Sequence, residues 1–369
     1  MPRVLRRIVP LLVLLALPGR SATAQEHDHE HMLAEPSAAP KLDLHGFFDV
    51  TLRAARLTSG GRDSTALGSA LGQFDLFMSS RLSDRISFLG EAVLEADEKG
   101  GGGIDLERAY VRYAFSDRLR VTAGRTHSAV SYWYVTCHHG ALLQPTIQRP
   151  IPVRFEDEVD GGILPAHAVG MELSGRQALG DLSLDWVGNL ANGRPADRTL
   201  VQTTGDANRD KQLGLSATLS APGLVEWHAG GALFHDRTPA DPATGLAMDQ
   251  DIASAHLAMR APWVDEVAEY FSVRDRERDA VPALPATRNH AWYGVVTLGP
   301  GTLRPYLAIE GVRIAAPDHF YAGLRDLDRG TLGLRCDVNA FNVVKLEYRN
   351  ALRAGERTHE LLLQTAFTF

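Results

Sequence analysis

Apolar and polar residues alternate along most of the chain after Pro40. Between Leu42 and Arg53 the even positions carry Leu, Gly, Phe and Val, and the odd positions carry mainly Asp, His, Thr and Arg. A period of two is typical of a strand with one apolar and one polar face. The alternation recurs in the ranges 86–95, 108–115, 331–338, 344–349 and 360–369. The pattern predicts an all-β protein.

Short and long connections take turns between these predicted strands. Short turns are expected at 83–84, 116–117, 179–181, 221–223, 261–263, 299–301 and 339–340. Longer polar segments are expected near 58–70, 97–103, 127–166, 191–210, 236–250, 276–287, 315–326 and 352–357. Seven short turns and eight long loops predict sixteen strands, with both ends of the sheet on the short-turn side.

This rhythm is typical of a transmembrane antiparallel β-barrel, which has an even number of strands, short periplasmic turns and long outer loops. A sheet in hydrocarbon must close on itself, because every backbone polar group needs an internal partner. A soluble β-sandwich has no reason to sort its turns by length in this way. We therefore expect residues 41–369 to form a barrel of about 16 strands, in line with the even strand numbers of such barrels.

The first 24 residues have the layout of a secretory signal peptide. Arg3, Arg6 and Arg7 precede a short apolar run, and Ala22-Thr23-Ala24 is a small-residue cleavage site. The apolar run is shorter than the roughly 20 residues that a membrane-spanning helix needs. We expect residues 1–24 to be removed and the exported chain to begin at Gln25.

Residues 25–40 are expected to form a His- and acid-rich periplasmic tail and linker. His27, His29 and His31 alternate with carboxylates. Such a tract can hold divalent metal ions weakly in a flexible segment. No other cofactor is expected from the sequence.

Charge narrows the choice of partners. The whole chain has a formal net charge of −7, and the predicted signal peptide contains arginines but no acidic residue. An acidic protein lacks the basic surface that nucleic acid needs, so nucleic acid is not an expected partner. Many charges fall on the predicted polar strand faces, and a barrel of 16 strands is wide enough for a water-filled channel.

The segment 127–166 is much longer than the other predicted loops and is rich in aromatic residues and histidine. With the strand count, the turn rhythm and the terminal Phe369, it makes the chain resemble the 16-stranded bacterial outer-membrane porins, with the phosphate-selective branch among the candidates. The resemblance implies that this third loop folds into the barrel and narrows the pore. It also implies pore-lining roles for Arg108, Arg112 and Arg120 on the wall and for His138, His139, Glu156, Asp157 and Glu158 in the loop.

The resemblance implies passive diffusion of small hydrophilic solutes or ions across the outer membrane, without enzymatic activity. A substrate-specific uptake channel for an anion or a metal ion fits the same pattern, as does an outer-membrane barrel enzyme. Expected partners are outer-membrane lipid and lipopolysaccharide, a homotrimer, and the assembly machinery that would read Phe369. The sequence does not decide between these functions.

Overall fold

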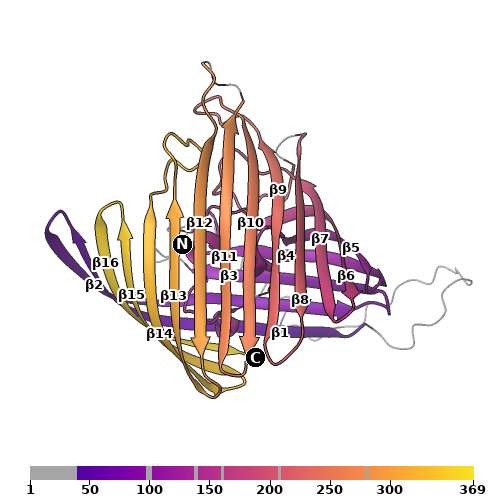
Figure 1. Cartoon of the computed structure of the whole chain (residues 1–369), viewed down its shortest axis with the longest axis horizontal. Helices are drawn as coiled ribbons and strands as arrows, with labels where there is room; N and C mark the ends of the chain where they lie inside the picture. The colour runs from indigo at the N-terminus through magenta and orange to yellow at the C-terminus, as the bar shows by residue number, and fades with distance from the viewer. Residues whose placement is uncertain are drawn as a thin grey trace, which may run out of the picture. The chain divides into compact units, whose positions relative to one another are not determined.

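The alternating segments close into a barrel in the computed structural model, which describes residues 40–96, 102–136, 140–158, 162–206, 209–278, 280 and 282–369. Each strand pairs with the next along the chain in antiparallel register, and the first strand pairs with the last. The prediction of sixteen strands is confirmed for this part of the chain (Figure 1).

The strands differ in length, and the two longest are the first two. In chain order they are β1 (Leu42–Ser59), β2 (Arg62–Arg81), β3 (Ile86–Ala96), β4 (Gly102–Ser116), β5 (Leu119–His127), β6 (His167–Leu179), β7 (Leu182–Asn192), β8 (Lys211–Ala221), β9 (Glu226–Thr238), β10 (Met248–Ala261), β11 (Val264–Glu277), β12 (Thr287–Leu298), β13 (Leu303–Arg313), β14 (Leu327–Asn339), β15 (Asn342–Arg353) and β16 (Glu356–Thr368).

Helical turns occur in the segment between β5 and β6. They are α2 (Tyr132–Thr136), α3 (Gly140–Leu143) and the 3₁₀ turn η1 (Ile151–Val153). Among the described residues, no helix has the length and apolar character required to span a bilayer.

The two ends of the sheet meet at Gly46 and Phe369. The backbone N–H of each residue donates to the carbonyl of the other, at 3.0 Å in both directions. The Phe369 ring lies directly over Gly46, since a Cβ atom on that glycine would be 2.1 Å from the ring. The absence of a side chain at Gly46 therefore gives the terminal aromatic residue its place at the seam.

Strands on opposite walls of the barrel run in different directions. In Figure 1 the indigo and purple strands cross behind the orange strands β9–β12 at a steep angle. Closure of a sheet requires each strand to tilt by roughly 35–45° from the barrel axis, so front and back walls cross in projection.

All seven predicted short turns are confirmed, but two predicted long loops are wrong. The connections at 58–70 and 352–357 are two-residue turns at Gly60-Gly61 and Ala354-Gly355, all four with positive φ. Such pairs form the tight turns that suit the twist of a hairpin. The small polar residues beyond Ser59 hid the strand pattern, although the ladder itself needs only backbone groups and continues to the turn.

Candidate functional site in the barrel interior

The inner face of the barrel carries buried charges, and the outer face carries exposed apolar residues. On β15, Lys345, Glu347 and Arg349 are buried, whereas Leu346 and Tyr348 between them are 43% and 45% exposed. Charged side chains are almost never fully buried unless they are paired. The inner wall on this side must therefore be covered by partners.

The partner is the segment 128–166 between β5 and β6, which we call the inserted segment. Three wall carboxylates accept hydrogen bonds from its backbone. Glu269 on β11 accepts from the Trp133 N–H at 2.9 Å, Glu310 on β13 from the Ile151 N–H at 2.6 Å, and Glu347 on β15 from the Ile147 N–H at 2.7 Å. The segment thus lies against the inner wall.

Wall cations donate to the same segment. Arg335 donates to the Gln144 carbonyl at 2.8 Å, and Lys345 donates to the Thr146 carbonyl at 2.8 Å. Arg349 reaches the Gln148 side chain at 2.6 Å. A segment with little secondary structure has many backbone groups to satisfy, and the charged wall satisfies them.

An apolar cluster holds the middle of the inserted segment. Trp133 and Tyr134 are fully buried and pack with Phe271 and Tyr293 on the wall. The Trp133 and Tyr293 rings meet edge to face, with centroids 5.6 Å apart. The segment is therefore packed as a folded element, with its aromatic residues in a core between loop and wall.

Beside the inserted segment lies a cavity of about 430 Å³, which we call the open cavity. It is lined by Arg108, Arg112 and Arg120 from β4 and β5, together with Tyr132 of α2 and His256 of β10. The structure thus brings the three predicted wall arginines together on one lining.

The three arginines differ in their partners. Arg108 Nε forms an ion pair with Glu91 at 2.6 Å, and Arg112 lies 3.8 Å from Glu172. The buried Nε atom of Arg120 has no hydrogen-bond partner among the described residues. The cavity therefore presents cationic donors that the protein satisfies only in part.

The acidic cluster of the loop does not meet these three arginines. Glu156 is buried and pairs with Arg194 at 2.6 Å, and its backbone carbonyl accepts from Arg198 at 2.8 Å. Glu158 accepts from the Phe155 N–H at 3.0 Å, and Asp157 is exposed. Glu156 lines a different cavity, together with Arg194 and Arg198 of the loop after β7.

Burial dominates the titration of the acidic cluster. It raises the pKa of Glu156 to about 7, against the opposing charges of Arg194 and Arg198. It also raises the pKa of the Asp157 carboxyl and lowers the pKa of Arg154 to about 10. The pair of Glu156 with Arg194 is therefore sensitive to pH near neutrality.

The other predicted site residues lie outside the described part of the chain. They are His138 and His139 of the loop and His27, His29 and His31 of the tail. Sequence reasoning also missed Glu269 and Arg194. Glu269 alternates with apolar Ala268 and Tyr270, so the strand pattern could have found it. Arg194 is in a polar loop and carries no such signal.

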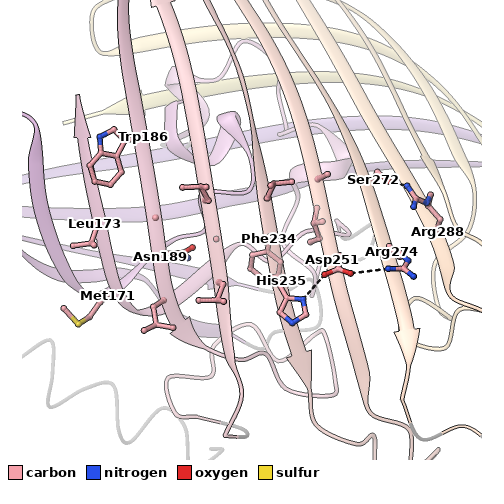
Figure 2. A pocket seen from close by; sticks show the side chains of 18 residues that line it. Met171, Leu173, Trp186, Asn189, Phe234, His235, Asp251, Ser272, Arg274 and Arg288 are labelled. Carbon is pink, nitrogen blue, oxygen red and sulfur yellow. Dashed lines mark hydrogen bonds and ion pairs between the residues drawn. The ribbon is translucent and has the colours of Figure 1, made fainter. Parts of the chain in front are cut away.

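A second cavity, of about 850 Å³, lies on the outer wall over β6–β12. Figure 2 shows it, with apolar side chains such as Leu173 and Trp186 at one end. At the other end His235 hydrogen-bonds Asp251 at 2.8 Å, and Asp251 lies 3.7 Å from Arg274. We call it the outer groove. Its exposed leucines and its position on the outer face separate it from the barrel interior.

Comparison with known proteins gives structural likeness only. No family model matches the chain, and no curated protein matches its sequence. Among solved structures, the anion-selective porin from Comamonas acidovorans matches with a TM-score of 0.61 and 12% identity, over 90% of this chain and 100% of that one. OmpF of Salmonella typhi, in complex with daunomycin, matches with a TM-score of 0.55 and 14% identity, over 89% and 97%.

A loop L8 deletion mutant of OmpT, an outer membrane protein of Vibrio cholerae, matches with a TM-score of 0.56 and 11% identity, over 90% of this chain and 100% of that one. The fold is that of bacterial outer-membrane porins. The predicted fold class is confirmed, and the fold is consistent with the outer membrane. Identities of 11–14% show the fold alone.

Proposed function

We propose that this chain is an outer-membrane porin that lets small hydrophilic solutes or ions diffuse through its lumen. The observation that carries the proposal is the open cavity beside an anchored loop. The inserted segment covers the inner face of β11–β16, while a water-accessible space remains along β4–β10. A loop that fills one side of a wide barrel and leaves the other open would narrow the pore without closing it.

The cationic lining favours anions as the preferred solutes. Arg108, Arg112 and Arg120 face the open cavity, and the Nε donor of Arg120 has no partner among the described groups. Arginine side chains are effective donors to carboxylate and phosphate oxygens. An anion-selective channel, including one specific for phosphate, is therefore our second candidate function, and the anion-selective porin among the structural neighbours agrees with it.

Planar-bilayer recording of the purified protein tests both functions. A general porin should give open, ohmic channels whose current rises linearly with salt. An anion-specific channel should give a reversal potential of anion sign under a KCl gradient, and phosphate should saturate or block the chloride current. A folded protein that gives no channels would overturn both proposals.

A group of three contacting side chains, Ser220, His228 and Glu226, offers an alternative, enzymatic function that can be tested. Ser220 Oγ lies 2.7 Å from His228 Nδ1, and His228 Nε2 lies 3.1 Å from Glu226. A hydroxyl, an imidazole and a carboxylate in contact, in this order, resemble the catalytic triad of a serine hydrolase. We propose that Ser220 and His228 only line the open cavity, because Glu226 is 40% exposed at the turn and orients the His228 ring weakly. A fluorophosphonate probe that labels the wild type but not Ser220→Ala would favour the enzyme.

The outer groove supports the proposal that outer-membrane lipid or lipopolysaccharide is a partner. Exposed leucines such as Leu190 and Leu233 suit acyl chains, and Arg274 and Arg288 at the far end suit a phosphate group. Trimer formation is proposed on the likeness to a trimer form of OmpT of Vibrio cholerae. Recognition of Phe369 by the assembly machinery, a cleaved leader over residues 1–24 and weak metal binding by the tail remain proposals.

A further inference from the structure

A group of three buried metal-ligating side chains lies where the inserted segment joins the barrel. His127 is the last residue of β5 and His167 is the first residue of β6, and the two are directly opposite in the β5–β6 register. Directly opposed side chains on an antiparallel pair are close neighbours. Their rings are 5.6 Å apart between centroids.

The third member, Glu107, comes from a bulge in β4. Glu91 is opposite Arg108 and Ala92 is opposite Leu106, so Glu107 is the extra residue between them. A bulge turns a side chain away from the direction that regular alternation would give it. Here it brings the Glu107 carboxylate to the two histidines, which regular pairing of β3 with β4 would not do.

The donor atoms are close enough to share one ion. Glu107 Oε2 lies 2.9 Å from His167 Nε2 and 4.0 Å from His127 Nε2, and the three donor atoms all lie within 4.8 Å of one another. Ligands at zinc distances in a tetrahedron are about 3.4 Å apart. Small side-chain rotations would therefore give His127 and His167 the spacing that a shared ion needs.

The surroundings bury the group almost completely. The side chains of Glu107, His127 and His167 are 3–5% exposed. Arg125 is nearby and donates hydrogen bonds to the backbone carbonyls of Glu107, Val201 and Thr203. The Phe155 ring packs against His167, with centroids 5.1 Å apart.

Two imidazoles and one carboxylate form the same three-ligand set as known zinc sites. Nitrogen and carboxylate ligands together suit Zn²⁺ and its neighbours better than the hard ions Ca²⁺ and Mg²⁺, which take oxygen ligands. We propose that Glu107, His127 and His167 bind a Zn²⁺-type divalent ion. The ion joins the two ends of the inserted segment and fixes its base to the wall. This site is separate from the histidines of the tail.

The test uses the full chain, with His27, His29 and His31 replaced by Asn so that the tail cannot contribute. Co²⁺ serves as a spectroscopic probe, and Zn²⁺ then displaces it. We expect one equivalent of Co²⁺ with visible ligand-field absorption, and at least a tenfold weaker affinity in His167→Asn and in Glu107→Gln. The control His290→Asn, on a strand far from the site in the chain order and bonded to Tyr270, should bind like its parent.

Folding is checked separately by the shift in gel mobility on heating. If His167→Asn does not fold, His127→Asn and Glu107→Gln take its place. Zinc should also slow proteolysis of the inserted segment in the parent protein and not in the site variants. The proposal is overturned if the folded parent binds no equivalent of Co²⁺, or if the site variants and the His290 control bind equally.

Discussion

Two sides of the same inner wall use charge in opposite ways. On the filled side, the inner face of β11–β16, carboxylates and cations are buried and bonded to the inserted segment. On the open side, along β4–β10, Arg112 and Arg120 line a cavity. Inward-facing charge therefore does not by itself mark a path for solutes. Whether a wall charge anchors a loop or meets water depends on where the loop lies.

Removal of the inserted segment should have the largest effect on this comparison. Replacement of residues 131–164 by a short Gly-Ser linker would leave the filled side as open as the other. We expect single-channel conductance to rise severalfold, because the cross-section of the pore grows. Deletion within the exposed turn Asp241–Gly245 is the control and should leave conductance unchanged. Equal conductance in the wild type and the linker variant would falsify the proposed narrowing.

Removal of a wall carboxylate should lower the free energy of unfolding more on the filled side than on the open side. Glu347 accepts from Ile147 and Tyr306 and pairs with Arg349, all in a buried setting. Glu347→Ala should lower the free energy of unfolding by about 3–5 kcal/mol, since it leaves a buried cation without its partner.

The matched variant on the open side is Glu172→Ala. Glu172 lies 3.8 Å from Arg112 beside the open cavity, so water can replace it. We expect a loss of about 1 kcal/mol or less. Urea unfolding in detergent measures both variants, and similar losses would contradict the distinction between the two sides.

Replacement of Arg108, Arg112 and Arg120 by Ala tests the open side by selectivity. The reversal potential under a salt gradient should shift toward cations, because three positive charges leave the lining. The same change at Arg335 on the filled side, which is held by Gln144 and Asp337, should alter selectivity much less. A shift of equal size from Arg335→Ala would show that anchored charges also control the pathway.

A change of pH tests a single carboxyl group of the inserted segment, Glu156. Burial raises its pKa to about 7, above the value of 4.5 that an unperturbed glutamate has. A raised carboxyl pKa means that the folded state binds the proton more tightly than the unfolded state. The contribution of Glu156 to stability is therefore present below about pH 4.5, falls between pH 4.5 and 7, and is lost above that range. Glu156→Gln should remove this part of the pH dependence of stability, which is measured as the thermal melting temperature of the folded protein at pH values from 4.5 to 7.

The sequence by itself determined the sheet. Alternation assigned the inner and outer faces of strands such as β15, and turn rhythm gave the number of strands. Both signals are local, because each residue of a strand faces lipid or lumen according to its parity alone. Beyond Ser59 many side chains are small and polar, so no alternation is visible there. The β1–β2 hairpin was therefore predicted to be a long loop.

Only the tertiary structure decided the interior. Glu156 meets Arg194 rather than the arginines of β4 and β5, and Glu107 meets His167 across 60 residues of sequence. The path of the inserted segment depends on many weak contacts with distant strands, and a bulge that shifts one residue changes which side chains meet. The local alternation of apolar and polar residues does not predict such long-range contacts. The wall could therefore be predicted from the chain, while the division into a filled and an open side required the fold.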